Sequence, residues 1–219
     1  VPFVLVALQP DLATATCYLP ILAAALVLAG LTRKTVAVLV IAAVLVGLVG
    51  WNFGLKDYPK KRVMTLLFPG QDPQGAGYHV LQSKIAIGSG GLFGKGFGKG
   101  SQSQLRFLPA RHTDFVLSVI GEEFGFAGIL TALALFYLLL ARICKSVGHS
   151  RARAGGYIVF MIGCLIGFQF LVNVMMIVGI LPIAGIPLPF LSYGGSSLLA
   201  NVLAVGLVLN VKMRRFANV

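Results

Sequence analysis

The stretch DFVLSVIGEEFGFAGILTALALFYLLLA, residues 114–141, decides the fold of this chain. From Phe115 onward it is apolar and long enough to cross the hydrocarbon core of a bilayer, which needs about 20 helical residues. Its first ten residues nevertheless hold three of the six acidic residues of the whole sequence, Asp114, Glu122 and Glu123. A charge at the edge of a bilayer is costly unless it is paired or faces water, so these acids mark a candidate functional site.

The composition extends this interpretation to the whole chain. Hydrophobic residues make up 58% and charged residues 11% of the sequence, and the mean hydropathy is +0.92. Soluble domains carry about 25% charged residues, so the composition predicts an integral membrane protein. The net charge of +12 then favours phospholipid headgroups or an anionic lipid substrate over nucleic acid. Cys17, Cys144 and Cys164 form no CxxC pair, and we interpret them as packing residues.

Five segments are long and apolar enough to span a membrane. They cover residues 11–31, 35–55, 115–141, 156–180 and 190–211. We therefore predict an all-α polytopic helical bundle that forms a single membrane domain. Residues 56–113 are too rich in charge and glycine for a simple connector, and we predict a large loop there with short helices. Within this loop, residues 78–87 are amphipathic and predict a short interfacial or re-entrant helix.

Basic residues predict the orientation of the bundle. The three short basic regions, in the first and third connections and the C-terminal tail, carry as many Lys and Arg residues as the loop 56–113. Short loops count for more in the positive-inside rule, so we place these regions in the cytoplasm and the long loop outside. The nine basic residues of that loop either gather a phosphate-bearing substrate or simply face anionic headgroups. They are Lys56, Lys60, Lys61, Arg62, Lys84, Lys95, Lys99, Arg106 and Arg111.

The segment GSGGLFGKGFGKG, residues 88–100, contains seven glycines and two lysines. Glycine allows backbone amides to converge on an oxyanion, so a phosphate cradle is one interpretation. The segment lacks the Walker A spacing, and a flexible hinge explains it equally well.

Asp114 follows His112 and Thr113 at the start of the apolar stretch. The simple interpretation is that Thr113 or Asp114 caps a helix, and the sharper one makes Asp114 a general base tuned by Arg111 and His112. On an unbroken helix Glu122 lies about 12 Å further along the axis. Paired glycosidase carboxyls stand ~5 to 9.5 Å apart, so we interpret Glu122 and Glu123 as partners for basic residues that support the site.

Other polar groups lie at membrane depth. Gln169 and Asn173 are four residues apart on one helix face, which predicts interhelical hydrogen bonds or the wall of a polar cavity. Asp11 lies at the start of the first predicted span, where it either caps a helix or pairs with the basic loop. The segment PLPFLSYGGSS, residues 187–197, contains two prolines and a Gly-Gly pair that prevent a uniform helix, and irregular backbone at this depth needs cover from protein or water.

Four segments together resemble the SEDS family of bacterial cell-shape and division proteins. They are QPDLATA (9–15), DPQGAGYHVLQSKIAIGSGGLFGKG (72–96), SQSQLRFLPARHTDFVLSVIGEE (101–123) and PLPFLSYGGSS (187–197). The sequence of these segments is more similar to the RodA elongation branch than to the FtsW division branch. Ala13 departs from the glycine usual in the family, and the family has about ten spans, so we expect the chain to be the C-terminal part of a longer protein.

The resemblance implies a peptidoglycan glycosyltransferase that polymerises lipid II at the outer face of the bacterial plasma membrane. It also implies a class B penicillin-binding protein as partner during cell elongation. Asp114 would be the catalytic residue, and the configuration at the anomeric carbon would be inverted. Our own assignment from charge and position gives the pyrophosphate to a set of basic residues: Lys84, Lys95, Lys99, Arg106, Arg111 and His112. Supporting roles are expected for Asp11, Glu122, Glu123, Gln169, Asn173, Ser192 and Ser196.

Two alternatives come from other classes. A flippase or transporter of lipid-linked precursors also needs polar groups within the bundle and basic charge at its exit, and a non-catalytic scaffold would activate a separate synthase. The sequence indicates no cofactor and no metal ligand cluster, and it leaves open whether a divalent cation assists the pyrophosphate.

Overall fold

The computed structural model describes residues 5–6, 12–30, 35, 76–105, 107, 112–148, 150 and 153–214. The predicted all-α architecture is confirmed, since this part of the chain consists of helices and their connections. The helices are α2 (Leu12–Thr16), α3 (Tyr18–Leu28), α6 (Ala76–Gly90), α7 (Ser101–Gln104), α8 (Val116–Gly148), α9 (Arg153–Val178) and α10 (Gly195–Met213).

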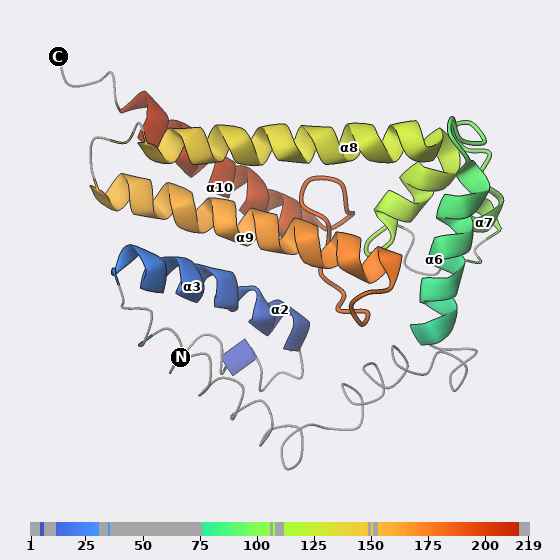
Figure 1. Ribbon diagram of the computed structural model, residues 1–219, viewed down its shortest axis with the longest axis horizontal. Helices are drawn as coiled ribbons and strands as arrows, with labels where there is room; N and C mark the ends of the chain where they lie inside the picture. Colours follow the sequence, from blue (N-terminus) through green and yellow to red (C-terminus); the bar gives the residue numbers. More distant parts are fainter. Residues whose placement is uncertain are drawn as a thin grey trace, which may run out of the picture.

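The long helices form one packed layer (Figure 1). Helices α8 and α9 lie side by side, and α10 packs against both. Helix α3 lies along the other side of α9. Helix α6 stands across the end of this layer and contacts α8 and α9, with the short helix α7 beside it. The described helices of the loop predicted at 56–113, α6 and α7, therefore lie at one end of the bundle.

Among the described residues, three helices are long and apolar enough to cross a membrane, namely α8, α9 and α10. Helix α8 extends past the predicted end at residue 141 to Gly148, and α9 begins at Arg153 rather than at residue 156. The predicted start of the last span at residue 190 is wrong, because α10 begins only at Gly195. Pro187, Pro189 and the positive φ of 65° at Phe190 keep the preceding segment out of a helix. The predicted span 35–55 lies outside the described residues apart from residue 35.

The two other predicted elements are present with different bounds. Residues 11–31 contain the short helices α2 and α3 in place of one continuous helix, with a turn at Cys17. The amphipathic helix predicted at 78–87 is α6, which runs from Ala76 to Gly90. Because α6 stands across the end of α8, it has the orientation expected of an interfacial helix (Figure 1).

Helix α8 is not continuous. Gly125 has φ 68° and ψ −161°, a conformation open essentially only to glycine. Figure 1 shows the matching sharp bend between a short first segment of α8 and its long straight part. The helix is therefore broken at Gly125, three residues after Glu122. The acids Glu122 and Glu123 lie on the short segment 116–124, whereas the long straight part begins at Phe126.

The glycine-rich loop that follows α6 fills this break. The amides of Lys95 and Gly96 donate to the carbonyls of Glu122 and Glu123, each at 3.0 Å. In return, the amides of Phe126 and Ala127 donate to the carbonyls of Gly91 and Leu92, at 2.9 and 3.1 Å. A Cβ atom on Gly94 would lie 2.1 Å from the carbonyl oxygen of Glu123, so only glycine permits this close approach. The loop thus replaces the backbone hydrogen bonds that α8 loses at Gly125.

Two apolar clusters hold the helices together. The first joins Phe115 and Phe136 of the α8 region to Met176, Ile177 and Leu188. Phe136 also stacks on Phe170 of α9, with ring centroids 4.4 Å apart. The second cluster lies toward the opposite end of the bundle and consists of Ile143, Val159, Ile166 and Val208. The first cluster lies directly beneath Asp114 and fixes the base of the polar end.

Candidate functional site

Asp114 lies in a turn immediately before α8, which begins at Val116. The helix therefore begins later than the sequence interpretation of Thr113 or Asp114 as cap residues requires. The Asp114 side chain is half-buried, whereas the neighbouring Phe115 is 1% exposed. The turn is thus anchored by the Phe115 ring on one side and leaves the acid at the boundary of the bundle.

Three consecutive carbonyl groups of this turn accept hydrogen bonds from distant parts of the chain. The Tyr193 amide donates to the His112 carbonyl at 2.7 Å, and the Ser192 hydroxyl donates to the Thr113 carbonyl. Asn173 Nδ2 donates to the Asp114 carbonyl at 3.1 Å. We name residues 112–114 and these three donors the carbonyl clamp. It fixes the backbone of Asp114 without using the carboxylate.

The donors of the clamp are themselves held in place. Asn173 is fully buried, and its Nδ2 also donates to the carbonyl of Ile186 at 2.9 Å. The Ser192 hydroxyl accepts a hydrogen bond from the Leu188 amide at 2.7 Å. The irregular segment from Ile186 to Tyr193 is therefore covered by protein, as its position requires. Gly185, with φ 69°, lies beside the acid, since a Cβ atom there would be 3.9 Å from Asp114 Oδ2.

Helix α6 joins the site through a buried serine pair. Ser83 Oγ lies 2.8 Å from Ser118 Oγ of α8 and donates to the carbonyl of Ile177 at 3.1 Å. Both serines are completely buried. The next residue, Lys84, is exposed, and its Nζ would be 2.7 Å from a Cβ atom on Gly179. Lys84 thus reaches over the C-terminal end of α9, where a positive charge is favoured by the helix dipole.

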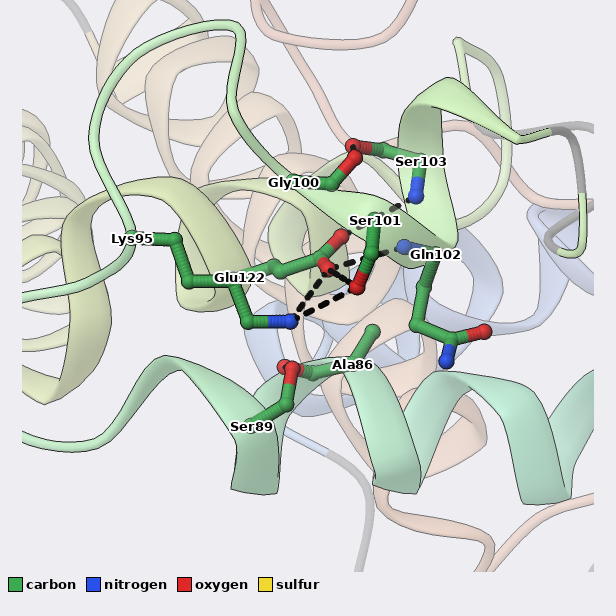
Figure 2. Close-up of polar contacts among 8 residues, drawn as sticks. All are labelled: Ala86, Ser89, Lys95, Gly100, Ser101, Gln102, Ser103 and Glu122. Atoms are coloured by element: carbon green, nitrogen blue, oxygen red, sulfur yellow. Dashed lines mark hydrogen bonds and ion pairs between the residues drawn. The ribbon is translucent and has the colours of Figure 1, made fainter.

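Glu122 forms a second polar centre, the Glu122 node, which Figure 2 shows together with its partners. The carboxylate is 0% exposed and forms an ion pair with Lys95 at 2.9 Å. It also accepts hydrogen bonds from the amides of Gln102 and Ser103, at 2.9 and 3.0 Å, and from the Ser101 hydroxyl at 3.3 Å. The interpretation of Glu122 as the partner of a basic residue is confirmed.

The node leaves no space for a larger residue at position 100. A Cβ atom on Gly100 would lie 2.6 Å from Glu122 Oε2 and 2.4 Å from Ser103 Oγ. All the donors of the node belong to the glycine-rich loop and to α7. Glu122 therefore holds the loop region to α8 and does not form a carboxylate pair with Asp114.

The remaining predicted site residues are spread over the same end of the molecule. His112 and Lys99 are exposed, while Lys95 is partly enclosed by its ion pair. Glu123 is only 7% exposed, and Ser196 is exposed in the first turn of α10. Gln169 Oε1 is buried and has no hydrogen-bond partner within the described residues. Asp11, Arg106 and Arg111 lie outside the residues that the structure describes.

Two residues of this region were missed by the sequence interpretation. Ser83 appeared only as one polar position of an amphipathic helix, and its small size was the available signal for close helix packing. Gly125 lies within an apolar run whose hydropathy does not change at the break, and the only signal was the presence of a glycine two residues after Glu123. Hydropathy patterns report burial and carry no information on φ.

An apolar groove runs along α8 next to the carbonyl clamp. It has a volume of about 480 Å³ and is lined by Ile120, Phe124, Ala132, Phe136, Phe190 and Leu191, among others. Leu191 precedes Ser192 of the clamp, so the groove and the Asp114 turn share one segment. Metal ligands are not clustered here, because no group of three or more His, Cys, Asp or Glu side chains lies together among the described residues. None of the three cysteines forms a disulfide bond.

The fold and this site define a multi-pass helical membrane protein. At one end of its bundle lies an acidic residue, Asp114, whose backbone is fixed by hydrogen bonds from distant parts of the chain. The family model of the cell cycle proteins FtsW, RodA and SpoVE matches residues 1–216. This chain belongs to that family.

Individual relatives support the assignment to this family. The peptidoglycan glycosyltransferase MrdB of Escherichia coli (strain K12) is 44% identical over 214 residues, which cover 98% of this chain and 58% of that protein. The probable peptidoglycan glycosyltransferase FtsW of Geobacter sp. (strain M18) is 45% identical over 159 residues, or 73% of this chain and 43% of that protein. This chain thus spans less than two thirds of the length of these relatives.

A solved structure agrees with the fold. A chain of the structure described as "Structural coordination of polymerization and crosslinking by a peptidoglycan synthase complex" superimposes with a TM-score of 0.74 and 34% sequence identity. The match covers 97% of this chain and 58% of that chain.

Proposed function

We propose that the protein containing this chain is a peptidoglycan glycosyltransferase that polymerises lipid II, with Asp114 as its general base. The observation that carries the proposal is the carbonyl clamp. Three hydrogen bonds from elements far apart in the sequence hold the backbone of one acid at the end of the bundle. Such rigid support is what a catalytic group needs, because small misplacements reduce rates strongly.

The reaction joins two glycan units. The 4-hydroxyl oxygen of one unit attacks the anomeric carbon of the other, and the Asp114 carboxylate takes the hydroxyl proton. The bond between the anomeric carbon and the pyrophosphate oxygen breaks, and undecaprenyl pyrophosphate leaves with the electron pair. One displacement inverts the configuration, so a single base and positive charge near the leaving group suffice.

Basic side chains at this end would attract the pyrophosphate. Lys84 and Lys99 are exposed, and so is the side chain of His112, whose carbonyl belongs to the clamp. We assign the leaving group to them, together with Arg106 and Arg111. Lys95 is a weaker candidate than the sequence implied, because its ammonium group already pairs with Glu122. The apolar groove beside Leu191 offers a place for the hydrocarbon tail of a lipid-linked substrate.

Asn173 positions Asp114 in this mechanism. We expect Asn173→Ala to leave two buried carbonyls without their donor, at a cost of about 1–3 kcal/mol. We also expect kcat for polymerisation to fall much more than KM changes, because the acid is displaced while the substrate surface stays. Gln169→Ala is the matched control, one helical turn earlier and with no partner for Oε1 among the described residues. An equal fall in kcat in the two variants would show that Asn173 has no specific role in positioning Asp114.

The cellular setting follows from the same proposal. We place the protein in the bacterial plasma membrane, with the Asp114 end on the extracytoplasmic side, where lipid II is polymerised. A class B penicillin-binding protein would cross-link the strands during elongation. Support comes from the loop charge pattern and from the similarity to a chain of a peptidoglycan synthase complex.

The test uses the full-length protein in liposomes with purified lipid II, with and without its transpeptidase partner. The proposal expects glycan strands from the wild-type protein. Transfer of lipid II between leaflets without any polymer would identify a flippase instead. Polymer that forms only when a separate synthase is added would identify a scaffold. Either of these outcomes overturns the proposal.

A further inference from the structure

The glycine-rich loop, residues 91–99, presents large apolar side chains to the surroundings. Phe93 is 85% exposed, Phe97 is 82% exposed and Leu92 is 68% exposed. These are large values for residues that favour burial, and exposed apolar patches mark interaction sites. The ion pair with Glu122 and the bonds to α8 occupy the loop backbone and Lys95, but not these rings.

The loop has a defined place relative to the membrane. It is hydrogen-bonded to Phe126 and Ala127, the first residues of the straight part of α8. From Phe126 to Arg142, the next charged residue, this part is roughly 24 Å long at about 1.5 Å per residue, so a hydrocarbon core of ~30 Å reaches at least to the level of Phe126. The loop is therefore fixed at the level where the spanning helix leaves the hydrocarbon.

The apolar surface of the loop continues into that of the spanning helix. Phe97 contacts Phe124, with ring centroids 6.2 Å apart, and Phe126 and Leu130 are more than half exposed on the adjoining part of α8. The outward face of a membrane-spanning helix meets lipid, so the loop prolongs a lipid-facing surface. Lys99 is exposed beside these rings and can reach lipid phosphates.

The backbone of the loop also fits a position in the interface. The amides of Gly94, Lys95, Gly96 and Lys99 all donate to carbonyls of the protein. Exposed amides oppose entry into an apolar medium, and the four hydrogen bonds lower that cost. A protein partner would need a surface shaped to two separated rings, whereas lipid accepts them in any arrangement.

We propose that residues 91–99 form a membrane anchor that inserts Phe93 and Phe97 into the interfacial region of the phospholipid leaflet at the Asp114 end. The anchor holds the Glu122 node, and through it α7 and the end of α6, at the membrane surface. This role does not depend on the chemistry proposed for Asp114.

The test measures the depth of nitroxide labels by electron paramagnetic resonance. Single cysteines at positions 93, 97 and 138 are labelled in a cysteine-free form of the full-length protein, in nanodiscs that contain anionic phospholipid. Leu138 is an exposed residue far along α8 and provides the reference for the hydrocarbon core. Phospholipids labelled at known positions calibrate the depth scale.

We expect the labels at 93 and 97 to collide with oxygen more often than with a water-soluble nickel chelate, at a depth between the headgroups and residue 138. Collision with the nickel reagent typical of a water-exposed label would overturn the proposal. Low collision with both reagents would overturn it as well, because the rings would then be covered by protein. Unchanged thermal stability of each labelled protein shows that the loop remains folded.

Discussion

Asp114→Asn is expected to abolish lipid II polymerisation, with a loss of about 10²–10⁴-fold as typical for a general base. The replacement removes the proton acceptor and keeps the size of the side chain. The carbonyl clamp uses only backbone oxygens of residues 112–114, so asparagine keeps all three of its hydrogen bonds. The measurement is the initial rate of glycan strand formation by the full-length protein in liposomes.

The control experiment tests whether the Asp114→Asn variant is folded. We expect the melting temperature of the variant to equal that of the wild-type protein, whereas Asn173→Ala should lower it. Asp114→Ala should be as inactive as Asp114→Asn. A polymerisation rate near the wild-type value in Asp114→Asn would contradict the assignment of the base, even if the protein proved to be a polymerase.

The clamp explains why this part of the site was only partly predictable. The acid itself stands out in the sequence, since six acidic residues are few and three gather at the start of one span. Its support does not, because the partners are backbone carbonyls separated from Asn173 and Ser192 by 59 and 79 residues. Asn173 was interpreted as a residue for hydrogen bonds between helices, but its targets are one turn and one loop.

The helices were predictable for a simple reason. Long apolar runs must satisfy their backbone internally in lipid, and an α-helix does so, which predicted α8, α9 and α10, although α8 extends further to Gly148 and α10 begins only at Gly195. The break at Gly125 escaped prediction because its cause is a second segment. The glycine-rich loop supplies hydrogen bonds to both sides of the break, and neither sequence segment alone indicates the other.

Glu122→Gln is expected to lower the free energy of unfolding by about 1.5–3 kcal/mol, the usual worth of hydrogen bonds to a charged group. The carboxylate is completely buried, and four donors converge on it. An amide carries no charge for Lys95, and its NH₂ group is a donor placed among donors. The loss should appear as a lower melting temperature and as faster hydrogen exchange at the amides of Lys95, Gln102 and Ser103.

Two comparisons separate this effect from a general sensitivity of the region. Glu123→Gln makes the same chemical change one residue later, where the side chain forms no ion pair within the described residues, so we expect little loss of stability. Lys95→Met should cost about 1 kcal/mol, because Lys95 is 29% exposed and the amides of Gln102 and Ser103 still bind the carboxylate. Similar losses in all three variants would contradict the Glu122 node. A loss of stability that is largest in Glu122→Gln would instead show that this one buried carboxylate holds the glycine-rich loop and α7 against α8.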